Sequence, residues 1–156
     1  MSRHARGDRG GMALALAVLA LLVIGALVAG GFAAAHLEVR VGRNTLYAAQ
    51  ASGAAEAGAV SVVANWDSDH LGALAPGDGA SLPAVPLPDL AAYEPSVVRL
   101  NQELFVVRSL GTRSDATGGV LARRVVSLVV RLADSAAPGS PTVRPLANRA
   151  WAELYE

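Results

Sequence analysis

Histidine, cysteine and carboxylate side chains build most catalytic and metal sites, and this chain holds few of them close together. The three histidines, His4, His36 and His70, lie in three different segments, and the chain has no cysteine. We therefore expect no multi-histidine or thiolate metal site and no disulfide. The run 67–70, Asp-Ser-Asp-His, could offer oxygen and imidazole ligands to a cation. Short acidic runs more often cap or end helices, and we expect that role here.

Two carboxylates outside that run, Glu103 and Asp115, have no evident catalytic partner in the sequence. No nucleophile elbow, phosphate-binding loop, zinc-protease helix or dinucleotide fingerprint occurs. We interpret both carboxylates as solvated loop residues, and we expect neither an enzyme nor a cofactor. The formal net charge is +0 and no arginine cluster alternates with aromatic residues, so the pattern of a nucleic-acid-binding protein is missing.

The N-terminal segments carry the clearest signal in the sequence. Residues 1–11 form a short basic leader with Arg3, Arg6 and Arg9 against Asp8. Residues 12–35 hold no charge and, as a helix, would extend roughly 36 Å, enough to cross the hydrocarbon core of a bilayer. The basic leader predicts a cytoplasmic N-terminus. A cleavable secretory signal, with Ala33-Ala34-Ala35 before the cut, is the alternative, but such signals have shorter apolar cores.

The residues beyond the apolar run divide into a second helical segment, a connector and a strand-rich domain. Residues 36–66 repeat apolar side chains at helical spacing and predict an amphipathic extension that ends near Asn65. Residues 67–95 are rich in Pro and Gly and read as an irregular connector. Residues 96–156 predict a hairpin around 101–103, a strand at 120–132 and a short final strand near 150–155, with 133–149 irregular. The predicted fold class is α+β, with a long helix packed on a small three- or four-stranded antiparallel sheet.

The predicted strand 120–132 has the most regular alternation in the chain. Val126, Leu128, Val130 and Leu132 share one face, while Ser127 and Arg131 share the other. We expect Leu128 to be a core residue of the exposed domain.

Three stretches together resemble the N-terminal region of PilX-type minor pilins. They are Arg9-Gly10-Gly11-Met12-Ala13-Leu14, then 37–44 (LEVRVGRN), then 50–58 (QASGAAEAG). The resemblance covers roughly residues 9–64. It implies a pilin-like fold, cleavage by a prepilin peptidase after Gly11, and a mature chain that begins at an N-methylated Met12. Major pilins generally carry Glu at the fifth mature position, where this chain has Leu16, and this departure resembles minor subunits.

The resemblance therefore implies a non-enzymatic minor subunit of a type IV pilus in the bacterial inner membrane, with its C-terminal domain in the periplasm. Its partners would be other pilin or pseudopilin subunits through the N-terminal helix, the prepilin peptidase, the inner-membrane assembly machinery and the lipid bilayer, with no nucleic acid. Two alternatives share this topology. One is a minor pseudopilin of type II secretion, and the other is a single-pass envelope protein that keeps residues 1–11 and does not polymerise.

Overall fold

The structure of the protein is a computed structural model that describes residues 7–133, 143–147 and 151–154. The chain divides into two compact units, one up to Arg43 and one from Asn44 onward. A single helix, α1 (Gly7–Ala64), runs through this boundary. Leu and Ala are strong helix formers, and they carry the helix without a break through Gly30 and Gly31. The helix ends one residue before the expected Asn65.

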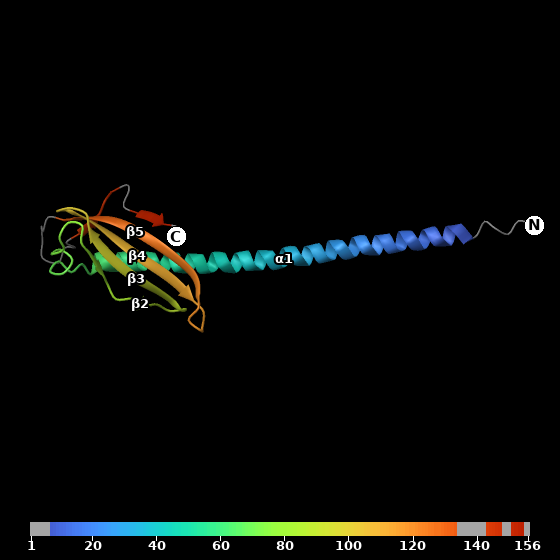
Figure 1. Cartoon of the computed structure of the whole chain (residues 1–156), viewed down its shortest axis with the longest axis horizontal. Helices are drawn as coiled ribbons and strands as arrows, with labels where there is room; N and C mark the ends of the chain where they lie inside the picture. The colour runs from blue at the N-terminus through green and yellow to red at the C-terminus, as the bar shows by residue number, and fades with distance from the viewer. Residues whose placement is uncertain (1–6, 134–142, 148–150, 155–156) are drawn as a thin grey trace, which may run out of the picture. The chain divides into compact units, whose positions relative to one another are not determined.

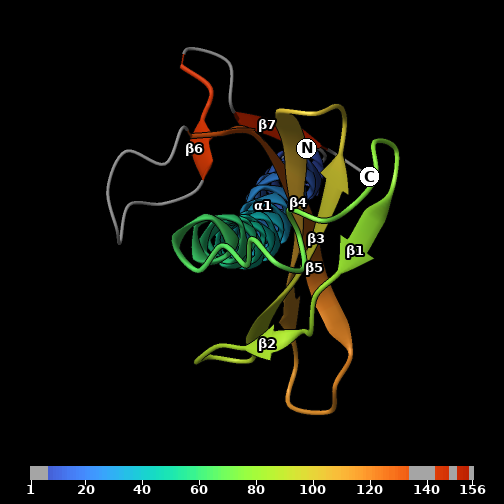
Figure 2. The same cartoon turned by 90° about the vertical axis from the view of Figure 1, so that its left-hand side faces the viewer.

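The unit from Asn44 onward contains the C-terminal part of α1 and an antiparallel sheet (Figure 1). Within the described residues the sheet has seven strands. They are β1 (Gly79–Ser81), β2 (Val85–Pro86), β3 (Ala91–Arg99), β4 (Leu104–Ser114), β5 (Val120–Leu132), β6 (Val143–Pro145) and β7 (Trp151–Leu154). The order of hydrogen-bonded neighbours in the sheet is β1-β3-β4-β5-β6. In addition, β2 pairs with β3 and β7 pairs with β5. Figure 2 shows β3, β4 and β5 beside the end of α1.

The predicted α+β class is confirmed, because a long N-terminal helix packs on an antiparallel sheet. The predicted extent of the sheet is wrong in two places. Two short strands lie inside the expected connector 67–95, where β3 also begins, and β6 lies inside the expected irregular segment 133–149. These short strands are too brief to show an alternating pattern. They form because the longer strands β3 and β5 offer unpaired backbone groups at their edges.

The core lies on the face of the sheet that contacts α1. Val97, Val107 and Leu128 are paired across the three long strands, and all three are almost fully buried. Phe105 pairs with Val130, and both are completely buried. The predicted alternation of strand 120–132 is therefore confirmed for its central residues.

Two glycines bring α1 and the sheet into close contact. A Cβ at Gly58 of the helix would lie 2.7 Å from a ring carbon of Tyr93 and would also collide with the hydroxyl of Ser109. A Cβ at Gly111 of β4 would collide with the backbone of Ala51 and would lie 2.5 Å from the backbone nitrogen of Ala55. Only glycine permits this approach of helix backbone to strand, so the two positions set the distance between the layers.

Arg99 at the end of β3 connects the helix-to-sheet connector to the β3–β4 turn. Its guanidinium donates hydrogen bonds to the carbonyl oxygens of Gly72 (3.0 Å) and Leu74 (2.6 Å) on one side. On the other side it donates to the carbonyls of Asn101 and Gln102, each at 2.9 Å. Its Cζ atom also lies 5.2 Å from the centre of the Phe105 ring. One side chain thus fixes two loops that carry no regular structure of their own.

Candidate membrane-anchor and assembly surfaces

The first surface is the N-terminal part of α1. Its most apolar 18-residue stretch has a mean hydropathy of 2.9, and none of that stretch is buried in the structure. By length and composition this is the one helix among the described residues that could cross a membrane. Gly11, Met12 and Leu16 all lie on it, and the side chains of Met12 and Leu16 are 67% and 61% exposed. A large apolar surface with no protein covering fits a membrane anchor.

The second surface is the C-terminal part of α1, residues 44–64, which has two different faces. The face toward the sheet is buried and consists of Ala51, Ala54, Ala55, Gly58, Ala59 and Val62. The opposite face is exposed and, after Asn44 and Thr45, consists of Leu46, Ala49, Gly53, Glu56, Ala57, Val60 and Ala64, which we call the outer stripe. Leu46 and Val60 are 55% and 53% exposed. A surface helix normally carries polar residues on the side away from its core, but the outer stripe has a single charge, Glu56.

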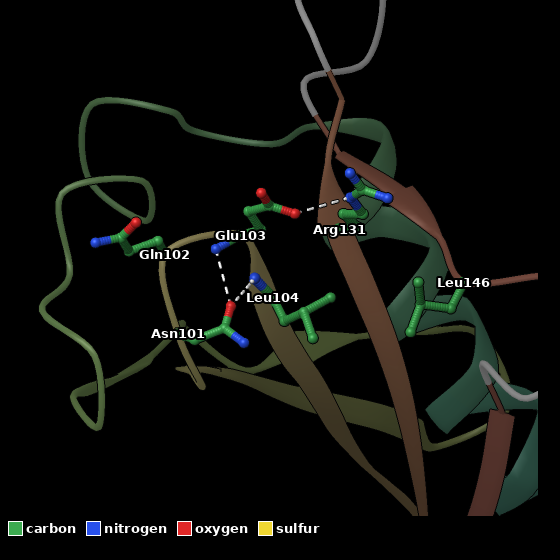
Figure 3. Close-up of a pocket in the computed structure, with 6 residues that line it drawn as sticks. All are labelled: Asn101, Gln102, Glu103, Leu104, Arg131 and Leu146. Atoms are coloured by element: carbon green, nitrogen blue, oxygen red, sulfur yellow. Dashed lines mark hydrogen bonds and ion pairs between the residues drawn. The ribbon is translucent and has the colours of Figure 1, made fainter.

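The β3–β4 turn and the neighbouring end of β5 line a cavity of about 550 Å³ (Figure 3). The side-chain oxygen of Asn101 accepts hydrogen bonds from the backbone N–H groups of Glu103 (2.9 Å) and Leu104 (2.8 Å). Glu103 forms an ion pair with Arg131, 3.1 Å from Oε2 to Nε, and both side chains are more than half exposed. Asn101, Glu103 and Arg131 thus have partners that shape the turn, and we assign no catalysis to them.

The two carboxylates that the sequence left without partners both have them. Glu103 pairs with Arg131, as described above. Asp115 accepts hydrogen bonds at Oδ1 from the backbone and hydroxyl of Thr117 and from the backbone N–H of Gly119. The Thr117 hydroxyl, followed by these backbone donors, lowers the pKa of Asp115 below its ordinary value of 3.8. Both residues lie in solvated turns, as expected, and their partners there give them a structural role that the sequence did not show.

The acidic run after α1 caps a turn, whereas the sequence predicted a cap or end of a helix. The Oδ1 atom of Asp67 accepts hydrogen bonds from the backbone N–H groups of Asp69 and His70, each at 3.1 Å. His70 and His36 are both exposed, and His4 lies outside the described residues. Among the described residues no three His, Cys, Asp or Glu side chains are grouped so that they could hold a metal ion.

A groove lies between one flank of α1 and the edge strand β7. It has a volume of about 280 Å³ and is lined by Ser52 and Glu56 of the helix, Val126 of β5, and Trp151 and Ala152 of β7. The Trp151 side chain is 51% exposed. Sequence reasoning did not anticipate this groove, because Glu56 and Trp151 are far apart in the chain and meet only through the pairing of β7 with β5.

Comparison with known proteins gives no match: no family model, no curated protein and no solved structure is significantly similar to this chain. The structure places Gly11, Met12 and Leu16 on the N-terminal part of α1, where the side chains of Met12 and Leu16 are exposed. The outer stripe, which the sequence analysis did not single out, gives the part of α1 within the folded unit an exposed face with a single charge.

Proposed function

We propose that this protein is a minor, non-enzymatic subunit of a type IV pilus or a related filament. In this proposal the prepilin peptidase cuts after Gly11, residues 12–35 hold the mature chain in the inner membrane, and neighbouring subunits cover the outer stripe. The sheet domain faces the periplasm before assembly. A minor pseudopilin of type II secretion would use the same surfaces.

The observation that carries the proposal is the apolar character of α1 on both of its faces within the folded unit. The inner face is covered by the sheet, but Leu46 and Val60 on the outer stripe are more than half exposed. Water does not favour large apolar side chains exposed in this way, and a surface helix normally carries mainly polar residues on the side away from its core. Helices of neighbouring subunits would cover it, and small residues such as Gly53 would let those helices approach closely.

Leu16 supports a low-copy position within the filament. An acidic side chain at this depth of a bilayer is tolerated only when a neighbouring charge pairs with it. Leu16 can make no such pair, so it removes both the cost of a buried carboxylate and the interaction by which bulk subunits would be recruited. We expect a few copies per filament or a position at one end, and deletion should reduce the number of filaments more than their stability.

The proposal is tested by placing a charge on the outer stripe. Val60→Arg should lower the amount of the protein in sheared filaments by at least about tenfold, because burying an unpaired charge costs several kcal/mol. Val120→Arg is the matched control, since Val120 is also 53% exposed but lies on β5 away from the stripe. Quantitative mass spectrometry of sheared filaments and of the membrane fraction measures both variants.

Equal recovery of the two variants in filaments would contradict the role of the outer stripe. Absence of the unmodified protein from filaments, together with a chain that retains residues 1–11, would favour an anchored envelope protein that does not polymerise. N-terminal sequencing of the membrane-purified protein decides the second point. If the protein is instead the most abundant filament subunit, the low-copy assignment is wrong although the filament assignment stands.

A further inference from the structure

The groove beside β7 combines a carboxylate with an exposed aromatic ring. Glu56 is the one charged residue between Asn44 and Ala64, and it lines the groove together with the half-exposed indole of Trp151. Within the described residues Glu56 makes neither a hydrogen bond nor an ion pair. Val126 and Ala152 form apolar walls, and Ser52 adds a hydroxyl.

The same chain twice places an arginine beside an aromatic ring and neutral oxygen acceptors. Arg99 lies over the ring of Phe105 while its nitrogens donate to backbone oxygens. Arg113 lies 5.6 Å from the centre of the Tyr47 ring while its Nε donates to Oε1 of Gln50 at 2.8 Å. In both cases the flat guanidinium lies over a ring and its N–H groups reach oxygen acceptors, which is the geometry that favours arginine over lysine.

The Glu56 and Trp151 pair offers stronger groups than either internal site. A carboxylate accepts two parallel hydrogen bonds from a guanidinium, and indole is the aromatic ring that attracts cations best. The groove opens to solvent on the flank of α1 next to the outer stripe, where a neighbouring subunit would pack.

We propose that this groove binds an arginine side chain of the neighbouring filament subunit. The guanidinium would pair with the Glu56 carboxylate and lie over the Trp151 ring, while its aliphatic stem would contact Val126 and Ala152. This inference rests on the proposed assembly function and adds to it: the outer stripe supplies apolar contact area, and the groove sets the register between subunits through a charge pair.

The experiment places a photoreactive amino acid at position 52 of the full-length chain in the producing cells. After illumination we expect a cross-linked product whose partner peptide belongs to another membrane-anchored filament subunit and contains an arginine at the cross-link. Glu56→Gln should lower the yield of this product about fivefold, within the range of exposed ion pairs. Glu94→Gln, at an exposed glutamate of β3 outside the groove, should leave the yield unchanged.

A second variant separates a charge pair from a simple steric effect. Glu56→Arg should abolish the product, and combining it with the exchange of the identified partner arginine to glutamate should restore it. Failure of this reciprocal exchange, or a yield that Glu56→Gln does not change, overturns the proposal. A product confined to one chain, or one formed with a soluble protein, overturns it too.

The outcomes also separate this inference from the proposed function. If the protein is recovered from filaments and a photoreactive residue at Val60 gives a product while one at position 52 gives none, the groove assignment alone is wrong. If neither position gives a product and the protein is missing from filaments, both proposals are wrong. A position-52 product that depends on Glu56 and contains a partner arginine supports the groove assignment.

Discussion

The two parts of α1 have similar compositions but opposite environments. Residues 12–43 and residues 44–64 are both dominated by Ala, Gly, Leu and Val, yet every residue of the first part is exposed while six residues of the second are buried on the sheet. The difference shows that apolar composition alone does not predict whether a helix is buried by its own chain or left exposed. The second part has a partner within the chain because Phe105 and its neighbours form a matching face, and the first part has none among the described residues.

The largest expected effect compares one leucine from each unit. Leu128 is 1% exposed in the core, whereas Leu22 is 65% exposed on the N-terminal part of α1. Leu128→Ala should lower the free energy of unfolding by about 2–5 kcal/mol because it leaves a cavity, and Leu22→Ala should change it very little. Denaturant unfolding of the full chain in detergent, followed by tryptophan fluorescence, measures both. Trp66 reports on the core, since its ring lies 5.1 Å from that of Phe105. Equal effects would show that the two units unfold together.

The next largest change in the free energy of unfolding is expected at one of two arginines in the sheet unit, Arg99 and not Arg131. Arg99→Ala removes hydrogen bonds to four carbonyl oxygens and the contact with Phe105, and we expect a loss of about 2–3 kcal/mol. Arg131→Ala removes one exposed ion pair with Glu103 and should cost less than about 1 kcal/mol. The same denaturant experiment applies. A larger loss for Arg131 would contradict the assignment of Arg99 as the residue that fixes both loops.

Smaller changes in stability, of opposite sign, are expected when Gly58 on the inner face and Gly53 on the outer face of the helix are each replaced by alanine. Gly58→Ala should destabilise the protein by about 1–2 kcal/mol, because the added methyl group collides with Tyr93 and Ser109. Gly53→Ala meets nothing within 4 Å and should stabilise the isolated subunit by about 0.5–1 kcal/mol through helix propensity. Thermal unfolding of both variants tests this. Stabilisation by Gly58→Ala would contradict the close contact between helix and sheet.

The smallest expected effect concerns pH and the β4–β5 turn. The Thr117 hydroxyl and the backbone donors hold the pKa of Asp115 below 3.8 in the folded chain. This carboxylate therefore stabilises the fold fully above its unfolded pKa, and the contribution is lost as the pH falls through the lower, folded value. Carboxyl-carbon NMR should give a titration midpoint below 3.8 for Asp115. A midpoint at or above that value would contradict the hydrogen bonding of this turn.

Much of the fold could be predicted because its main signals are local and long. The uncharged run and the helical repeat after it predict α1 to its C-terminal end near Asn65, although the helix begins at Gly7, five residues before the expected start at Met12. The alternation at 120–132 gives the bounds of β5 and its core face. The turn at Asn101 and the cap at Asp67 follow from side chains that bond to their own backbone. The candidate processing and assembly residues Gly11, Met12 and Leu16 also come from the sequence alone, and their roles stay predictions.

The tertiary structure alone decided the features that depend on pairing between distant segments. β2 and β3 are joined by a tight turn with positive φ at Asp89 (59°) and Leu90 (57°), and a leucine gives no sequence signal for such a turn. The alternation of β5 places Val125 on the face of the sheet away from α1, where the sequence predicts an exposed side chain. In the structure the Val125 side chain is only 2% exposed.

Dependence on distant segments also explains why the sequence did not distinguish the buried Gly58 from the exposed Gly53. It explains, too, why the groove between Glu56 and Trp151 was not predicted. Local propensity fixes a helix or a long strand, because each residue interacts mainly with near neighbours in the chain. Which helix face is covered, and which distant side chains line one groove, depends on strand order and register, which no short window of sequence contains.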